Sequence, residues 1–342
     1  MLDDLKYINH KDPKDTLYIA QNLDQQLTYD FNKELRLKID EFDKIVYVGM
    51  GGSALAGLLS QSWPGYDIPF ELSRSYSLPK YVDNKCLLII SSYSGNTEEV
   101  ISAFKEGINK SAQIIVITSG GQLEDLARKN NCNLYKVPSG YQPRYAVFYN
   151  FKILIDIFLQ LKFLSEEQQA IFRQCPEFVK KITSNFIPTI PTSSNIAKQI
   201  AQEASGKSVV IYAGPKLFPA AYKWKISFNE NAKQVAWCNQ LSEFNHNEFI
   251  GWSNQPPLKP YYIVELLSNL EDPRIQARFE LSNRLLSGLW PSPRLIDLEG
   301  ENLLNQLLYA IVLGDFVSLY TAILNGINPE PVDLIEKFKA NL

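Results

Sequence analysis

The sequence has few of the residues that metal sites and disulfide scaffolds need. Its 342 residues include only four cysteines and two histidines. The cysteines are Cys86, Cys132, Cys175 and Cys238, far apart and without a CxxC pair. Zinc knuckles require clustered Cys and His ligands, and disulfide frameworks require regularly paired cysteines. We therefore predict reduced thiols in a cytoplasmic protein without a metal site.

An excess of basic residues, an apolar leader and an uninterrupted membrane span are also missing. Lys and Arg number 34 against 37 Asp and Glu, so a general nucleic-acid or anionic-membrane surface is not expected. The first residues are polar, which argues against a secretory signal. Residues 145–163 and 303–324 are apolar but contain Asp156 and Asp315. We predict that both are buried helices of a soluble protein.

Length and composition predict a globular protein with two domains. Hydrophobic residues make up 45% and charged residues 21% of the chain, which is ordinary for a folded protein. The chain is too long for one compact core. A stretch rich in Pro, Ser and Thr at 185–195 is the best candidate junction, although the crossing may be placed anywhere between 150 and 195. We divide the chain into domains of residues 1–155 and 156–342.

Short apolar runs alternate with helical stretches in both halves of the sequence. Strands are expected at 44–50, 68–72, 86–92, 113–119, 132–137, 208–214, 261–267 and 294–299. Helices are expected at 53–61, 98–108, 122–130, 145–162, 217–233, 272–287, 301–325 and 331–340. Strands rich in Val, Ile and Leu and separated by helices indicate parallel sheets covered on both faces. The sequence therefore predicts an α/β fold of two tandem units, each a three-layer αβα sandwich.

A glycine-rich loop, Gly49–Ala54, follows the first predicted strand and opens a helix. Glycines let a ligand approach the backbone there, and the free N–H groups and the helix dipole favour an anion. The loop also fits the GxGxxG/A dinucleotide pattern, and Glu71 falls where a ribose-binding acid is expected. An NAD-dependent oxidoreductase is therefore one candidate function. A purely structural tight turn is the other interpretation.

A second loop, Ser91–Thr97, carries hydroxyl groups on Ser92, Ser94 and Thr97. The helix expected to follow it adds backbone N–H groups. Together these donors suit the oxygens of a phosphate ester. Helix capping by Ser94, Asn96 or Thr97 is the alternative, but one of these residues is enough for a cap. A dinucleotide fold has no use for a second hydroxyl-rich loop, so we favour a phosphate site.

VGMGGSALAG and SSYSGNTEE together resemble the sugar isomerase (SIS) domain, whose Ser/Thr loop binds the phosphate of phosphosugars. The segments GYQPRYAVFY, FNENAK, EFNHNE and NPEPVDLIEKFK are similar to those of the bifunctional phosphoglucose/phosphomannose isomerase family. The resemblance extends over residues 40–340. It implies two tandem SIS domains and a cofactor-independent isomerase. The implied substrates are glucose 6-phosphate and mannose 6-phosphate, which such an enzyme interconverts with fructose 6-phosphate through an enediol.

The same resemblance implies a role for individual residues of this sequence. Glu230 matches the family's catalytic glutamate and would carry a proton between C2 and C1. His246 would open the sugar ring, and the family donates this histidine across a dimer interface. Arg144 would stabilise the enediolate, because a guanidinium keeps its charge when buried. The resemblance thus implies a homodimer with shared active sites.

Further residues would contact the substrate. Gly52 and Ser53 would contact the sugar, while the second loop holds the phosphate. Lys337 and Lys339 lie two residues apart on a predicted helix and point to different faces, so at most one reaches the site, and we favour Lys337.

One position departs from the family pattern. Relatives often have Thr-Pro-Val before the last helix, and this chain has Glu330 in place of the threonine. If that threonine helps to admit both C2 epimers, the bulkier acid makes mannose 6-phosphate the less secure substrate. A non-catalytic phosphosugar-binding regulatory protein is the remaining alternative. The sequence has no room for a separate effector domain and no basic recognition helix.

Overall fold

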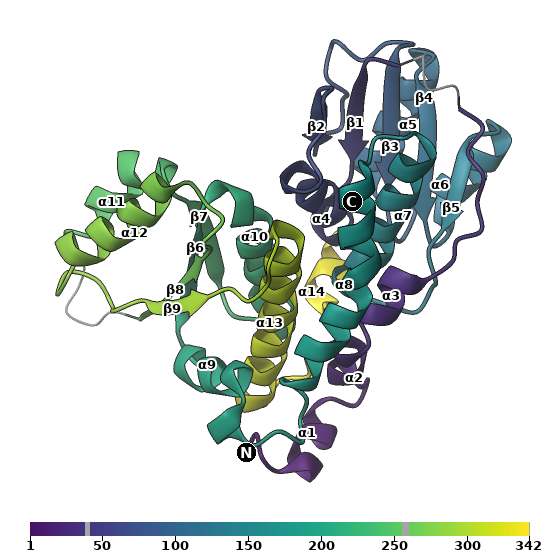
Figure 1. Ribbon diagram of the computed structural model, residues 1–342. Coiled ribbons are helices and arrows are strands. Elements are labelled where there is room, and N and C mark those ends of the chain that lie inside the picture. Colours follow the sequence, from purple (N-terminus) through teal and green to yellow (C-terminus); the bar gives the residue numbers. More distant parts are fainter. Residues whose placement is uncertain (38–41, 255–259, 342) are drawn as a thin grey trace. The chain divides into compact units, whose positions relative to one another are not determined.

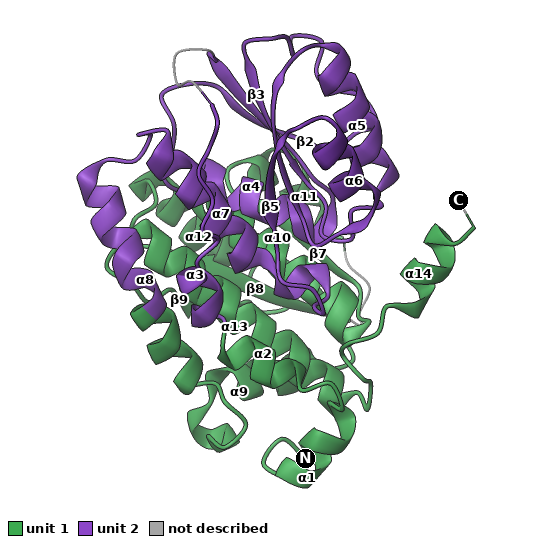
Figure 2. Ribbon diagram, turned by 90° about the vertical axis from the view of Figure 1, so that its right-hand side faces the viewer, with its two compact units in different colours: residues 1–22, 177–342 green, residues 23–176 purple. Residues whose placement is uncertain are grey.

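The computed structural model describes residues 1–37, 42–254 and 260–341 (Figure 1). The chain forms two compact units (Figure 2). Unit 2 contains residues 23–176, and unit 1 combines residues 1–22 with 177–342. The division at Pro176 lies inside helix α8 (Glu166–Ser184), whereas the boundary predicted at residue 155 lies inside α7 (Val147–Gln160). Unit 1 is therefore made from both ends of the chain, an arrangement that the sequence pattern did not predict.

The centre of unit 2 is a sheet of five parallel strands in the order β2-β1-β3-β4-β5. The strands are β1 (Lys44–Val48), β2 (Phe70–Ser73), β3 (Cys86–Ser91), β4 (Gln113–Thr118) and β5 (Asn133–Lys136). Every residue of the central strand β3 is buried. Its continuous apolar sequence follows from that position, because helices cover both of its faces.

Helices lie on both faces of this sheet (Figure 2). They are α3 (Asp24–Thr28), α4 (Gly51–Ser62), α5 (Glu98–Asn109), α6 (Gly121–Lys129) and α7. One core cluster joins Leu88 of β3 to Val100 of α5 and Leu123 of α6. On the other face, a Cβ atom at Gly57 would lie 2.5 Å from the Tyr47 ring, so glycine lets α4 pack closely on β1. The predicted αβα sandwich is confirmed for this unit.

Unit 1 contains a second parallel sheet, in the order β7-β6-β8-β9. Its strands are β6 (Ser208–Ala213), β7 (Ala236–Gln240), β8 (Tyr261–Leu267) and β9 (Arg294–Asp297). Strand β7 was not predicted. It lies at the edge of the sheet, and its sequence AWCNQ lacks a continuous apolar run because only one of its faces is covered. Trp237, for example, is 49% exposed.

Unit 1 also contains a set of helices. They are α1 (Leu5–Lys11), α2 (Thr16–Gln21), α9 (Ile196–Ala204), α10 (Phe218–Ser227), α11 (Glu248–Gly251), α12 (Pro273–Leu285), α13 (Leu303–Leu324) and α14 (Asp333–Lys339). The structure adds α1, α2, α3, α8, α9 and α11 to the predicted set. Helix α8 contains Pro176, a residue that usually interrupts helices, and the other added helices have nine residues or fewer.

Helix α13 forms the core of unit 1. It is long and apolar enough to cross a membrane, but 94% of its most apolar stretch is buried within the fold. Trp224 of α10 donates from Nε1 to the Ala310 carbonyl at 2.6 Å. A Cβ atom at Gly314 would lie 2.4 Å from the Trp224 ring, so glycine permits this close contact. The prediction of a buried helix at 303–324 is therefore confirmed.

Candidate active site

The order of strands in unit 2 places two loops at one edge of the sheet. From β1 the chain moves outward to β2 and then crosses to β3 on the opposite side. In open α/β sheets, ligands bind at the carboxyl ends of the strands where the direction of winding reverses. Here the loops at that point are Gly49–Ser53, after β1, and Ser92–Thr97, after β3. They are the two loops that the sequence singled out.

The first loop leads directly into α4. The N-cap residue Met50 makes no side-chain cap, and Gly51 has a φ of +49°. Ser53 is buried, and its Oγ accepts a hydrogen bond from the Tyr93 N–H at 3.0 Å. A hydroxyl that accepts one bond can still donate its own hydrogen. The first loop thus combines an uncapped helix N-terminus with a fixed hydroxyl group.

The second loop leads into α5 in the same way. Thr97 is the N-cap residue but makes no side-chain cap. Ser94 Oγ instead accepts from the Asn96 N–H at 3.3 Å, and Asn96 Oδ1 accepts from the Gln122 N–H of α6 at 3.0 Å. None of the three residues proposed as caps therefore caps α5. The positive end of the α5 dipole stays available for an anion.

The hydroxyl groups of the second loop differ in exposure. Ser92 is buried, and its Oγ lies 2.9 Å from Thr97 Oγ1 and accepts from the Gly95 N–H at 3.1 Å. Ser94 is exposed and Thr97 half-buried. Gly95 has a φ of +71°, and a Cβ atom there would lie 1.8 Å from the Gly120 carbonyl. Glycine is therefore required at this position for the loop to close.

Arg144 is brought to the beginning of α4 by its backbone. It lies in the 3₁₀ turn η2 (Pro143–Tyr145) and is 1% exposed. Its guanidinium carbon is 4.5 Å from the centre of the Tyr145 ring. A Cβ atom at Gly52 would lie 2.7 Å from the carbonyl carbon of Pro143 and 2.8 Å from the Arg144 nitrogen. The glycine of the first loop thus allows the arginine backbone to pack directly against α4.

Tyr93, which the sequence analysis did not select, connects these loops. Besides its bond to Ser53, its hydroxyl donates to the Pro138 carbonyl at 2.8 Å and accepts from the Tyr141 N–H at 2.9 Å. It therefore joins the second loop to the segment that leads to Arg144. The only signal for it is an aromatic residue within an otherwise small and polar loop, SSYSGNT.

Glu230 lies in unit 1, at an irregularity in a helix. The sequence predicted one helix over 217–233, but the regular helix α10 ends at Ser227 and a π-helical turn, η5 (Phe228–Ala232), carries Glu230. The Asn231 side chain anchors this turn by donating from Nδ2 to Ser318 Oγ at 2.9 Å. Such turns are rare and frequently lie at functional sites.

The preceding turn of α10 is fixed by a buried ion pair. Lys223 and Asp315 are both buried and bonded to each other. Ser227 Oγ joins them, at 2.7 Å from Lys223 Nζ and 2.8 Å from Asp315 Oδ1. Removing one member of a buried ion pair leaves the other charge without compensation. The pair therefore ties the helix that leads to Glu230 firmly to α13.

His246 is exposed, on a segment of unit 1 whose flanks are anchored. It ends the 3₁₀ turn η6 (Glu243–His246). On one side, Asn245 donates from Nδ2 to Ser282 Oγ at 2.9 Å. On the other, Glu248 accepts hydrogen bonds from Tyr212 and from Asn239, the latter at 2.7 Å. The backbone is thus held while the imidazole faces outward.

Lys337 and Lys339 lie on α14, of which no residue is buried. Lys339 Nζ donates to Glu336 Oε1 at 3.0 Å, an exposed ion pair on the same helix. Exposed pairs of this kind contribute little to stability. The pair therefore does not decide between the two lysines, and our preference for Lys337 stays a prediction.

Six of the predicted site residues are positioned together within unit 2. They are Gly52, Ser53, Ser92, Ser94, Thr97 and Arg144. The remaining four belong to unit 1, and they are Glu230, His246, Lys337 and Lys339. That Glu230, His246 and at most one of the two lysines join these six residues in an active site stays a prediction.

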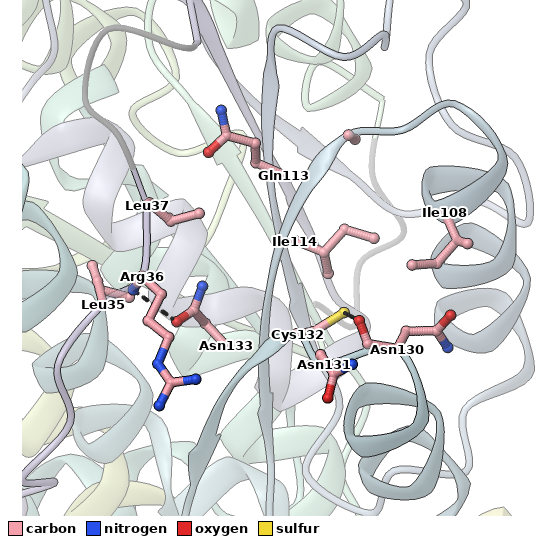
Figure 3. Close-up of a pocket in the computed structure, with 11 residues that line it drawn as sticks. Leu35, Arg36, Leu37, Ile108, Gln113, Ile114, Asn130, Asn131, Cys132 and Asn133 are labelled. Atoms are coloured by element: carbon pink, nitrogen blue, oxygen red, sulfur yellow. Dashed lines mark hydrogen bonds between the residues drawn. The ribbon is translucent and has the colours of Figure 1, made fainter.

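A cavity of about 650 Å³ lies elsewhere in unit 2, at the amino ends of β4 and β5 (Figure 3). Its lining includes Arg36, Gln113 and Asn133, and the Arg36 N–H donates to Asn133 Oδ1 at 3.1 Å. None of the predicted site residues lines it. Within residues 1–37, 42–254 and 260–341, no group of three His, Cys, Asp or Glu side chains is arranged to hold a metal ion.

The strand order of unit 2 argues against a dinucleotide site. The usual dinucleotide-binding fold has six strands in the order 3-2-1-4-5-6, whereas this sheet has the flavodoxin-like order 2-1-3-4-5. Glu71, the proposed ribose-binding acid, is exposed on β2 and accepts a hydrogen bond from Tyr81. The glycine loop therefore favours an anion at α4 without requiring a nucleotide.

Fold and loops together define a protein of the phosphosugar-isomerase class. Residues 193–342 match the family model described as the bacterial phospho-glucose isomerase C-terminal SIS domain. The bifunctional phosphoglucose/phosphomannose isomerase of Caldicellulosiruptor bescii is 34% identical, over 94% of this chain and 97% of that protein. The protein of the same name from Thermoplasma volcanium is 35% identical, over 89% and 93%. This chain belongs to the bifunctional phosphoglucose/phosphomannose isomerase family.

A solved structure supports the fold independently. The C-terminal domain of glucosamine-fructose-6-phosphate aminotransferase from Francisella tularensis superimposes with a TM-score of 0.69. The match covers 96% of this chain and 97% of that one, at 13% sequence identity. The same fold is thus found over nearly the full length of a solved domain with very different residues.

Proposed function

We propose that this protein interconverts glucose 6-phosphate and mannose 6-phosphate with fructose 6-phosphate through an enediol, without a cofactor. The observation that carries the proposal is the edge of the unit 2 sheet where two uncapped helices, α4 and α5, begin beside loop hydroxyls and the buried Arg144. A phosphorylated sugar has the charge and the oxygen atoms that this arrangement favours. Family membership supports the same conclusion.

The phosphate would bind at the second loop. The dipole of α5 and its first N–H groups attract the dianion, and the hydroxyls of Ser94 and Thr97 donate to its oxygen atoms. No lysine is required. Ser92, which is buried, would hold the loop in shape and turn its hydroxyl toward the ligand. Gly52 and Ser53 would contact the sugar at the beginning of α4.

Isomerisation then moves one hydrogen within the substrate. Glu230 would remove the proton from C2 of the open-chain aldose while O1 gains a proton, which gives the enediol. The C2 hydroxyl then loses its proton, and Glu230 returns its own to C1, which gives the ketose. No electrons leave the sugar, so no external oxidant is needed. Arg144 would stabilise the negative charge on the enediolate oxygen.

Ring opening requires a second acid and base, for which we propose His246. Its exposed side chain on an anchored segment suits a group that acts on a substrate bound by another chain. We therefore propose a homodimer in which His246 serves the partner's site. Lys337 of α14 would contact the substrate from the C-terminal end of the same chain.

The two C2 epimers pass through one enediol, so dual activity depends on the shape of the pocket near C2. Glu330 is half-buried, and its N–H donates to Asn328 Oδ1 at 3.0 Å. The site would therefore present an acid where relatives often have threonine. We propose slower conversion of mannose 6-phosphate than of glucose 6-phosphate.

The test is a coupled assay of the purified protein in EDTA, with the three sugar phosphates offered separately. Wild type should interconvert glucose 6-phosphate and fructose 6-phosphate without added metal. Glu230→Gln should lower kcat about 10²- to 10⁴-fold, the usual contribution of general acid–base catalysis. Glu177→Gln, at an exposed position on α8, is the matched control and should retain full activity.

Four results would count against the proposed function or one of its parts. Full turnover by Glu230→Gln would exclude it as the base. Loss of wild-type activity in EDTA would indicate a metal-dependent isomerase. A rise in melting temperature with NAD, but not with fructose 6-phosphate, would revive the oxidoreductase alternative. Binding of fructose 6-phosphate without turnover would favour the regulatory alternative.

The shared active site has its own test. Glu230→Gln and His246→Ala chains are each expected to be inactive as homodimers. A mixed dimer contains one intact site if His246 acts on the partner's substrate, so random mixing should restore about a quarter of wild-type activity. No restoration would mean that both residues serve the same chain's site.

A further inference from the structure

The π-helical turn that carries Glu230 ends at Lys233, whose backbone is left-handed with a φ of +51°. Its N–H donates to the Phe228 carbonyl, which closes the turn. Carbonyl groups in the last turn of a helix point beyond its end and need other partners. A cation at this position satisfies them and interacts favourably with the dipole.

The side chain of Lys233 supplies that cation to its own turn. Lys233 Nζ lies 2.9 Å from the Glu230 carbonyl oxygen and 3.4 Å from that of Asn231. It also donates to two carbonyl oxygens far away in sequence, those of Asn328 at 3.1 Å and Pro329 at 2.9 Å. An ammonium group has three hydrogens to donate, and the three shortest contacts use all of them.

The second pair of carbonyls belongs to the segment between α13 and α14. This segment follows Gly326, whose φ is +72°, and continues through Glu330 into a helix without a buried residue. Asn328 and Pro329 are therefore the last fixed point before the residues that include Lys337. Lys233 joins this point to the backbone of Glu230.

Stability alone does not explain this arrangement. Lys233 is an exposed residue, and water would solvate the same carbonyls if the ammonium were absent. Fixing a lysine side chain costs up to about 2 kcal/mol of rotamer entropy. The contacts thus contribute little to folding. They fix the distance between the turn of Glu230 and the segment 328–329 that precedes α14.

We propose that Lys233 is a positioning residue for catalysis, a role that rests on the proposed function. It acts through Glu230 and through the segment between α13 and α14, and it does not touch the substrate. By holding the backbone carbonyl of Glu230 and those of Asn328 and Pro329, it keeps the turn of the base and the start of the segment that leads to α14 at a constant separation. Asn231, bonded to Ser318, fixes the opposite side of the same turn.

The test compares Lys233→Met with Lys233→Arg. Methionine has a side chain of similar length and adopts the left-handed backbone at a similar energetic cost, but its side chain has no hydrogen-bond donor. The kcat for fructose 6-phosphate should therefore fall roughly tenfold to a hundredfold. KM should change less than twofold, because the loops proposed to bind the substrate, Gly49–Ser53 and Ser92–Thr97, do not include Lys233. Arginine keeps a multiple donor and should restore most of kcat. Lys181→Met, exposed on α8, should match wild type.

Hydrogen exchange separates this inference from the proposed function. In Lys233→Met, amides of residues 228–233 and 328–332 should exchange faster, with the melting temperature within about 2 °C of wild type. Unchanged kcat in an active enzyme would overturn the positioning role while the isomerase function stands. A wild type that converts no sugar phosphate would overturn both. Unchanged exchange would exclude the tether itself.

Discussion

The two sheets reverse their strand order in the same way, but the loops at the reversal have different chemistry. In unit 2 the loops after β1 and β3 end at helices without side-chain caps. In unit 1 the corresponding loops follow β6 and β8. There the Glu271 carboxylate accepts a hydrogen bond from the Lys216 N–H at 2.8 Å. A Cβ atom at Gly214 would lie 2.4 Å from Glu271 Oε1.

Unit 1 thus places a carboxylate at its own pair of loops, and we propose that a ligand phosphate takes the equivalent position in unit 2. Glu271 is buried, and this burial raises its pKa, partly opposed by the N–H donors around it. The acids of the α5 first turn are placed differently, since Glu98 accepts from the Tyr76 hydroxyl at 3.3 Å. One fold therefore supports two arrangements of these loops, and we propose that the internal acid Glu271 excludes a phosphate from the sheet of unit 1.

Among the substitutions that test the difference between the two units, Gly52→Ala in unit 2 should have the largest effect on turnover. The new Cβ atom would displace the backbone of Pro143 and Arg144, and a misplacement of about 1 Å lowers turnover roughly 10²-fold. Steady-state kinetics should show this loss in kcat/KM. Gly251→Ala in unit 1, where a Cβ meets nothing within 4 Å, should leave the rate unchanged. Equal rates in both variants would show that the contact at Gly52 is not required.

A second prediction concerns the central strands. Strand β3 carries no charge, whereas β8 carries Glu265, which is 1% exposed and accepts from Asn283 Nδ2 at 2.8 Å. Burial raises the pKa of Glu265 to about 7. Because the folded pKa exceeds the unfolded value, its stabilising contribution is complete below about pH 4.5 and is lost as the pH rises through 7.

Glu265→Gln should therefore stabilise the protein by about 3 kcal/mol at pH 8 and by little at pH 4.5. Glutamine keeps the acceptor for Asn283 and adds a donor. Asn283 Oδ1, which is buried without a hydrogen-bond partner in the described part of the chain, could accept from it. Urea unfolding at the two pH values measures the difference. A gain that is the same at both would exclude ionisation of Glu265 as its cause.

The smallest effect sharpens the comparison between loops. Thr97→Val in unit 2 removes a hydroxyl that we propose contacts the phosphate, and it should raise KM for fructose 6-phosphate about tenfold, the value of one hydrogen bond to a charged group. Ser268→Ala, at the corresponding loop of unit 1, removes a bond to Gln306 and should leave KM unchanged. A rise in KM for Ser268→Ala would indicate a second phosphate site.

Most of the fold could be predicted because its strands are buried on both faces. The run CLLIIS of β3 is typical of a strand in the middle of a parallel sheet. Strand β7 could not be predicted, since its exposed edge leaves no continuous apolar run. The membership of residues 1–22 in unit 1 depends on contacts such as that of the Tyr7 hydroxyl with the Ile323 carbonyl, at 3.2 Å. No local pattern encodes such a contact.

The candidate site also contains residues that could be predicted from the local sequence and residues that could not. The loops of Gly52 and Thr97 could be predicted because glycine and hydroxyl residues between a strand and a helix carry a local physical meaning. Glu230 and His246 were selected by family resemblance, since nothing in their spacing distinguishes them from surface residues. The π-helical turn at Glu230 depends on α13, through Asn231 and Ser318, and therefore on packing that the local sequence does not specify.

The division of unit 1 between both ends of the chain has a consequence for biosynthesis. Residues 23–176 form a continuous segment, so unit 2 can fold as soon as it leaves the ribosome. Helices α1 and α2 are made before unit 2 but pack on α13, which is made after it. They are thus buried only once α13 has been made, and until then they need protection from aggregation and proteolysis.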